Sequence, residues 1–242
     1  MKLIIDRGNT FYKVAVFDND KLVELKTYRN LTIPDLEAAF LSFDIKKSIF
    51  CSVGGIEKTE ILDFLKGNSE FVSMTEQLVL PIRIAYKTPL SLGKDRIASV
   101  VGASQVVKGK AVLVIDAGSC ICFDYLDKNA VYHGGSIAPG FGMKYKALHN
   151  FTADLPLLDL ESESIDLCGQ STDTCIHSGV INGTLCEIRG FIDSYSEIDK
   201  DLVVMLSGGD ADFIAERLNR NVIVEKHLVL QGLNVILDAN TK

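Results

Sequence analysis

The sequence lacks the features that mark several common classes of protein. It has no basic excess: the formal net charge is -7, whereas nucleic-acid binders usually carry a basic face. No apolar run approaches the ~20 residues of a membrane-spanning helix. The N-terminus lacks the basic and apolar regions of a secretory signal. We therefore expect a cytoplasmic protein with no nucleic-acid or membrane partner.

The chain also lacks the close spacings typical of metal ligands. Its 4 histidines stand apart, and no HxxxH or CxxC occurs, so a protein-ligated transition metal is not expected. Without a signal peptide, the 6 cysteines are expected to be free core thiols. They are Cys51, Cys120, Cys122, Cys168, Cys175 and Cys186.

Two familiar nucleotide motifs are missing. There is no GxxxxGK[ST] loop, and the glycines at 134–142 do not have the GxGxxG spacing of dinucleotide binders. The 134–142 segment is interpreted as a loop that lets backbone approach a ligand, with a structural tight turn as the alternative. Gly208-Gly209 has the same two interpretations, nucleotide contact or a plain strand-to-helix turn.

What is present is a pattern of short strands and helices that occurs twice. In the first half, hydrophobic alternation predicts strands and 3.6-residue spacing predicts helices, in the order β-β-β-α-β-α. The strands are expected at 2–6, 12–17, 21–28 and 47–53, the last ending at Gly54-Gly55, and the helices at 33–42 and 58–66.

The pattern restarts after Gly109, following a turn-rich stretch and a helix predicted over 95–107. Strands are expected at 111–117, 120–126, 130–135, 202–209 and 221–226, and helices at 141–150, 172–195, 211–218 and 228–238. At 242 residues, the chain is long enough for two closely packed lobes, which we place at 1–90 and 91–242.

The two halves share one local motif. Aligning "IIDRGNT" with "VIDAGSC" pairs Asp6 with Asp116 and Gly8 with Gly118, at an offset of 110 residues. Either copy alone is ordinary turn chemistry, because Asp caps turns and Gly accepts positive φ. Two copies at equivalent places favour an internal duplication.

These turns have the chemistry of a phosphate site. Gly8-Asn9-Thr10 and Gly118-Ser119-Cys120 allow an anion to approach backbone N–H groups. Asp6 and Asp116 are able to hold a hydrated Mg²⁺ or another cation, and Lys13 adds positive charge.

A third cluster, "LGKDR", opens the helix at 95–107. There the helix dipole stabilises the Asp95 anion, and Arg96 offers a planar fork for a carboxylate or phosphate. The alternative for the two residues taken alone is a helix cap and a solvated arginine.

In order along the chain, these motifs resemble the type III pantothenate kinases, a branch of the acetate and sugar kinase/Hsp70/actin superfamily. The matches to the family's motifs are Asp6-Gly8-Asn9-Thr10, Gly93-Lys94-Asp95-Arg96, Asp116-Ala117-Gly118-Ser119, Gly134 to Gly140, Thr152 to Pro156, Thr172 and the "SGGDA" at 207–211.

The resemblance implies an α/β fold of duplicated actin-like (ribonuclease H-like) lobes, each a mixed sheet with helices, and a nucleotide cleft between them. It implies ATP-dependent phosphorylation of the pantothenate primary hydroxyl, the first step toward coenzyme A, by a homodimer that uses Mg²⁺ and K⁺ or NH₄⁺.

The resemblance also implies a role for each matched residue. Asp95 would be the base, Asp116 would bind the monovalent cation, and Asp6 would bind Mg²⁺ through water. ATP would contact Asp6, Gly8, Asn9, Thr10, Lys13 and Ser119. Pantothenate would contact Tyr86, Gly93, Lys94, Asp95, Arg96 and Thr172, the threonine reaching across the dimer.

The chain departs from the family pattern at a few positions. Ser119, Cys122 and Ser207 stand where threonine is usual, and Arg7 replaces an apolar residue. Strand alternation should turn Arg7 away from Asp6, toward solvent or a neighbouring subunit. Two alternative functions are a kinase for another small hydroxy acid and a non-catalytic actin-like ATP-binding regulator.

Overall fold

A computed structural model describes residues 1–52, 59–74, 77–161, 163 and 165–242. The chain divides into two compact units, one of Met1–Lys108, Ala130–Tyr132 and His227–Lys242 and the other of Gly109–Asn129 and His133–Lys226. The boundary expected after residue 90 falls inside the first unit. The division at Gly109 coincides with the point where the sequence pattern restarts.

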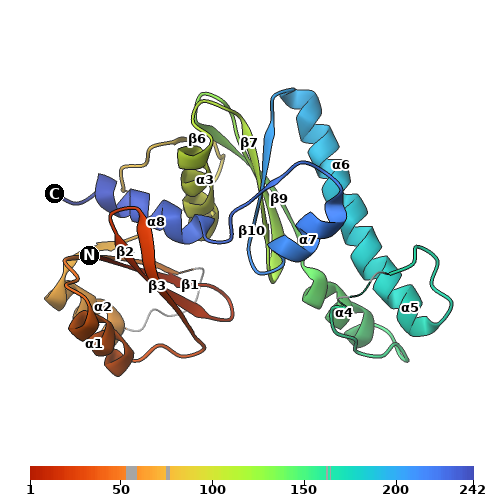
Figure 1. Cartoon of the computed structure of the whole chain (residues 1–242), viewed down its shortest axis with the longest axis horizontal. Helices are drawn as coiled ribbons and strands as arrows, with labels where there is room; N and C mark the ends of the chain where they lie inside the picture. Colours follow the sequence, from red (N-terminus) through yellow and green to blue (C-terminus); the bar gives the residue numbers. More distant parts are fainter. Residues whose placement is uncertain (53–58, 75–76, 162, 164) are drawn as a thin grey trace. The chain divides into compact units, whose positions relative to one another are not determined.

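The first unit is built on a five-stranded mixed sheet with the order β3-β2-β1-β4-β5. Three of its strands, β1, β2 and β3, are labelled in Figure 1. β1 runs antiparallel to β2 and parallel to β4. The strands are β1 Lys2–Arg7, β2 Tyr12–Asp18, β3 Lys21–Tyr28, β4 Lys47–Ser52 and β5 Glu70–Ser73. The helices are α1 Ile33–Ser42, α2 Thr59–Asn68, α3 Lys94–Val106 and α8 Leu228–Ala239, with a 3₁₀ turn at Pro89–Ser91.

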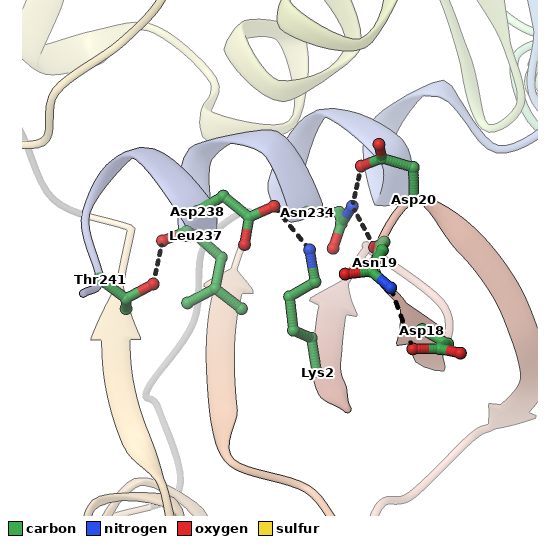
Figure 2. Close-up of polar contacts among 8 residues, drawn as sticks. All are labelled: Lys2, Asp18, Asn19, Asp20, Asn234, Leu237, Asp238 and Thr241. Carbon is green, nitrogen blue, oxygen red and sulfur yellow. Dashed lines mark hydrogen bonds and ion pairs between the residues drawn. The ribbon is translucent and has the colours of Figure 1, made fainter.

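Alternation along β1 separates the two faces of this sheet. Leu3 and Ile5 pack into an apolar core with residues of α1 and α2. Lys2, on the other face, reaches α8, where its Nζ lies 2.6 Å from Asp238 Oδ2 (Figure 2). Asn234 of α8 donates to Asn19 O at 3.1 Å in the turn between β2 and β3. The last helix therefore covers the sheet face opposite α1 and α2.

Helix α3 packs directly on α8. A Cβ on Gly232 would lie 1.7 Å from Ala98 O, and a Cβ on Gly102 would lie 2.4 Å from Leu228 O. The backbones of the two helices can approach closely because Gly102 and Gly232 have no side chain. Through this contact, α8 supports α3. The first turn of α3 contains Asp95 and Arg96, so their position depends on the helix that covers the first sheet.

The second sheet has the order β11-β10-β7-β8-β9-β6, and its first five strands repeat β5-β4-β1-β2-β3 of the first. The strands are β6 Arg83–Ile84, β7 Val112–Ala117, β8 Cys120–Leu126, β9 Val131–Pro139, β10 Val203–Ser207 and β11 Ile223–Val224. As in the first sheet, the central strand pairs antiparallel on one side (β7 with β8) and parallel on the other (β7 with β10). The predicted duplication of mixed α/β lobes is confirmed.

Helices α4 to α7 cover one face of the second unit's strands and bury a single apolar cluster with β7, β8 and β10. They are α4 Phe141–Asn150, α5 Thr172–His177, α6 Gly183–Ile198 and α7 Ala211–Leu218. The continuous helix predicted over 172–195 contains a π-helical segment, Ser178–Asn182, between α5 and α6. Its wider turn changes the helical phase of α6 relative to α5.

Other sequence expectations need smaller corrections. β5 and β6 were not predicted, because each is too short to show alternation. Lys58 and Gly54-Gly55, the expected start of α2 and end of β4, lie outside the described residues. All six cysteines are free, as predicted, but Cys168, Cys175 and Cys186 are exposed rather than in the core. Within the described ranges, no helix is long and apolar enough to cross a membrane.

Candidate active site

The first hairpin places a carboxylate opposite an amine. Asp6 of β1 pairs directly with Lys13 of β2, which puts their Cβ atoms about 4.5–5.5 Å apart on one sheet face. Asp6 is only 6% exposed. The loop is closed by the Gly8 N–H, which donates to Phe11 O at 3.0 Å, and Asn9 at its tip is exposed.

The side chain of Arg7 follows the predicted alternation. Arg7 pairs with Tyr12 across the hairpin, and its guanidinium carbon lies 5.5 Å from the centre of that ring. This places Arg7 on the face opposite Asp6, half-buried against an aromatic ring rather than free in solvent.

The second hairpin is shorter by one residue. Asp116 of β7 pairs with Cys122 of β8, and the Gly118 N–H donates to Cys120 O at 2.9 Å. Asp116 is half-buried and Ser119 is exposed at the tip. Cys122, not a cation, therefore occupies the position that Lys13 holds in the first hairpin, so the two turns offer different charge to a ligand.

Glycines from two other segments pack against this second hairpin. A Cβ on Gly140 would lie 2.1 Å from Gly118 O. Gly208 has φ +90°, and a Cβ there would lie 2.2 Å from Ala117 O and 2.6 Å from Asp116 Oδ1. Both glycines allow close backbone packing around the Asp116 turn.

The 134–142 segment is not a loop, which corrects the first interpretation of its glycines. Residues up to Pro139 belong to β9, and Phe141 begins α4. A Cβ on Gly135 would lie 1.6 Å from Phe123 O, so this glycine lets β9 lie against β8. The strand predicted at 130–135 already contained Gly135, but the continuation of β9 over 136–139 was not predicted.

The start of α3 holds the predicted base, Asp95, and the predicted substrate-binding residue Arg96. Gly93 is the N-cap residue, and the Arg96 N–H donates to Asp95 Oδ1 at 2.8 Å. A Cβ on Gly93 would lie 2.6 Å from that same oxygen, so glycine makes room for the folded-back carboxylate. Arg96 is 7% exposed and is not the solvated surface arginine of the alternative interpretation. Lys94 is half-buried.

Burial raises the pKa of the Asp95 carboxyl above its ordinary value, while the Arg96 N–H and the Arg96 charge act to lower the pKa. The position of Asp95 at the helix start, which is visible in the sequence, favours the anion. Burial is the larger cause and acts in the opposite direction. A carboxyl with a raised pKa beside a buried guanidinium is a candidate general base.

Tyr86 is held by the short β6 pairing. The Ala85 N–H donates to Tyr132 O at 2.9 Å, and the rings of Tyr86 and Tyr132 stack at 6.5 Å with an interplanar angle of 8°. Tyr132 is fully buried, whereas Tyr86 is half-buried. The strand pattern of "AVYHGG" gave the position of Tyr132 but not its role in supporting Tyr86.

Thr172 begins α5 and is exposed. It lines an apolar hollow of about 450 Å³ with Leu148, Leu155, Cys175, Ile176 and Gly179.

The predicted site residues are divided between the two compact units. Asp6, Gly8, Asn9, Thr10, Lys13, Tyr86, Gly93, Lys94, Asp95 and Arg96 belong to the first unit, and Asp116, Ser119 and Thr172 to the second.

Two mixed sheets that share an order of five strands, each with an Asp-x-Gly hairpin at its central strand, define a duplicated actin-like α/β fold. A psychrotroph glucokinase shares this fold, with a TM-score of 0.52, 11% identity and coverage of 98% of each chain. A Baf family protein from Campylobacter jejuni, named as a transcriptional activator, has a TM-score of 0.60 and 24% identity, covering 98% of this chain and 97% of its own.

The particular family follows from the sequence comparisons. The model of the type III pantothenate kinase family matches residues 2–194. A type III pantothenate kinase from Christiangramia forsetii is 39% identical over 244 residues, which cover 99% of each chain. The chain belongs to the type III pantothenate kinase family.

Proposed function

We propose that the chain transfers the γ-phosphoryl group of ATP to the primary hydroxyl of pantothenate, and that the start of α3 is the acceptor site. The observation that carries this assignment is the pair formed by Asp95 and Arg96. One is a largely desolvated carboxyl with a raised pKa, and the other is a buried guanidinium on the next residue. Pantothenate carries a hydroxyl and a carboxylate, the two groups that such a pair recognises.

In this proposal Arg96 binds the substrate carboxylate with its planar fork, and Asp95 accepts the proton of the attacking hydroxyl. The backbone around Gly93 and Lys94 lines the same helix start, and Tyr86 is held in place by its stack on Tyr132. Phosphoryl transfer passes through a loose transition state, so positioning the hydroxyl in line contributes more than removing its proton.

The first hairpin supplies contacts for ATP. Its exposed tip, Asn9 and Thr10, lets phosphate oxygens approach the backbone N–H groups of the loop, as Gly8 requires no space for a side chain. Lys13 adds a positive charge beside them. Ser119, exposed at the tip of the second hairpin, offers a hydroxyl to the nucleotide.

Mg²⁺ is the divalent ion implied for this reaction. The Asp6 carboxylate is a hard oxygen donor on the sheet face that carries Lys13, which fits a hydrated Mg²⁺ held through water. When bound, Mg²⁺ neutralises charge on the phosphates. The residues of the chain position ATP and the acceptor hydroxyl.

Asp116 is proposed to hold a monovalent cation. In the described parts of the chain, no three His, Cys, Asp or Glu side chains gather into a metal site. A single carboxylate with backbone packed against it at Gly208 suits a weakly held K⁺ or NH₄⁺ better than a tightly bound transition metal.

We therefore expect turnover to be faster in K⁺ or NH₄⁺ than in Na⁺ at equal ionic strength. The measurement is initial rate against salt with saturating ATP and Mg²⁺. Asp116→Ala should abolish the difference among the three salts, whereas Asp63→Ala on α2 should preserve it. Equal wild-type rates in all three salts would remove the cation from the proposal.

A homodimer is proposed to form over the apolar hollow beside Thr172. Two large hydrophobic residues of the segment after α4, Phe151 and Leu157, are 88% and 53% exposed. Leu155 of the same segment lines the hollow, and exposed apolar side chains are typical of a protein interface. A partner chain there would surround Thr172, which supports its role in substrate binding.

We expect Gly179→Arg to convert the dimer to a monomer, because it places a long cation in this hollow where a Cβ meets no neighbour within 4 Å. The check is molar mass by light scattering after gel filtration. Gly67→Arg, an equally open glycine on α2, is the matched control and should leave the mass unchanged. A wild-type monomer would contradict the proposal directly.

The second candidate is a kinase for another small hydroxy acid, because Asp95 and Arg96 specify a hydroxyl and a carboxylate but not the skeleton between them. The third, a regulator without turnover, would have no use for this pair. ADP release measured over a panel of hydroxy acids separates the three. Release with pantothenate no faster than with water, but fast with another acid, would favour the second, and no release with any acid would favour the third.

A further inference from the structure

Hydroxyl side chains within the helices of this protein commonly donate to a backbone carbonyl one turn earlier. This pattern satisfies the hydroxyl inside the helix. Examples are Ser104 to Val101 O at 2.7 Å, Thr184 to Val180 O at 2.6 Å, Ser194 to Gly190 O at 2.8 Å and Ser196 to Ile192 O at 2.7 Å.

Ser99 of α3 is different. It is 1% exposed, and across the described ranges its Oγ has no hydrogen-bond partner. A buried hydroxyl without a partner costs free energy, because it has lost its bonds to water and gained none in return. An alanine at this position would avoid that cost, so the hydroxyl calls for an explanation outside the packing of α3.

The position of Ser99 on the helix relates it to the proposed acceptor pair. At 3.6 residues per turn, Ser99 lies about 40° around the helix from Asp95 and about 60° from Arg96, between the two. Helical side chains lean over the turn that precedes them. The Ser99 hydroxyl therefore lies one turn below Asp95 and Arg96, on the side of α3 that they share.

Packing against α8 does not require this hydroxyl. Ala98 and Gly102 of α3 pack against α8 backbone to backbone. Ser99 lies beside that stripe, and its oxygen bonds to nothing on α8 among the described residues.

We propose that Ser99 is a further substrate-binding residue, whose Oγ hydrogen-bonds the polar middle of pantothenate, the amide or the second hydroxyl. The inference rests on the proposed function. Arg96 takes the carboxylate and Asp95 the reacting hydroxyl, so the groups between them meet the helix surface between those two residues. A serine hydroxyl both donates and accepts, which suits either group.

The test compares Ser99→Ala with Ser104→Ala, a control on the same helix whose hydroxyl is already satisfied within it. Ser99→Ala should raise the KM for pantothenate roughly three- to tenfold, the usual effect of losing one neutral hydrogen bond. The KM for ATP should not change. Ser104→Ala should leave both KM values unchanged.

Thermal melting distinguishes a substrate-binding role of Ser99 from a purely structural one, because only a structural role would lower the Tm of the ligand-free variant. Without ligand, Ser99→Ala should melt no lower than wild type, since no hydrogen bond is lost, and the Tm increase produced by pantothenate should shrink. If the alanine variant does not fold, the near-isosteric Ser99→Cys is measured in its place. An unchanged KM for pantothenate, or a lower Tm with an unchanged KM, would overturn the inference.

Failure of this inference is distinguishable from failure of the proposed function. If the wild-type protein does not phosphorylate pantothenate, the proposed function is wrong. If the wild-type protein does so and Ser99→Ala does so with the same KM, only the role of Ser99 is wrong.

Discussion

Asp95→Asn is expected to lose most pantothenate-dependent turnover while still binding ATP. The amide keeps the size of the side chain but has no carboxylate to receive the hydroxyl proton or to aim the hydroxyl. General-base contributions are typically about 10²–10⁴-fold, and we expect a loss in that range. Turnover by coupled ADP release and ATP binding by calorimetry are the two measurements.

The pH dependence of the wild type provides an independent check on the same residue. Burial raises the pKa of Asp95, so kcat/KM should fall on the acid side at a higher pH than an ordinary aspartate would give. Residual activity of Asp95→Asn should lack this acid limb. Near wild-type turnover in the variant would remove Asp95 from the mechanism.

The raised pKa also has a consequence for stability. A carboxyl whose folded pKa lies above its unfolded value favours folding when protonated, and that contribution is lost as pH rises through the folded pKa. At neutral pH the Asp95 carboxylate therefore opposes folding. Asp95→Asn should melt no lower than wild type at neutral pH, so its loss of turnover would not reflect unfolding.

Gly232→Ala is expected to have the largest effect on stability. Its added Cβ would lie 1.7 Å from Ala98 O and 2.6 Å from Ala98 C, so it meets backbone rather than a side chain that can rotate away. α8 would have to move off α3. We expect a loss of roughly 2–4 kcal/mol in the free energy of unfolding. Denaturant unfolding monitored by circular dichroism measures it.

The matched control is Gly190→Ala in α6, where the added Cβ meets no atom within 4 Å. Alanine forms helix better than glycine, so this variant should gain roughly 0.5–1 kcal/mol. If Gly232→Ala is as stable as wild type, the close contact of α3 with α8 does not hold the start of α3 in place. Activity of Gly232→Ala should fall with its stability.

The sequence predicted the duplicated fold because the signal is carried by long, regular strands. β1, β2, β7 and β8 alternate or run continuously apolar, and each hairpin follows an Asp-x-Gly. β5 and β6, which have four and two residues, are too short to show a period. The domain boundary also depends on a contact that no local pattern reports, the packing of α8 against α3 and the first sheet.

For the candidate site, the sequence predicted the residues but not the features that depend on tertiary packing. Motif order gave Asp95 and Arg96, but the burial that raises the pKa of Asp95 comes from tertiary packing. The ungapped alignment of the two hairpins did not show that Cys122 is the cross-strand partner of Asp116, because the second loop is one residue shorter. Ser99 lies among apolar residues of α3 and has no sequence signal of its own.

The proposed pantothenate kinase activity is tested most directly by a coupled assay of the wild-type chain and Asp95→Asn with pantothenate, ATP, Mg²⁺ and K⁺, with the product identified by mass. We expect the wild type to form ADP and phosphopantothenate in equal amounts, and Asp95→Asn to form little of either. Wild-type ADP release that does not depend on pantothenate, or no phosphopantothenate in the product, would contradict it.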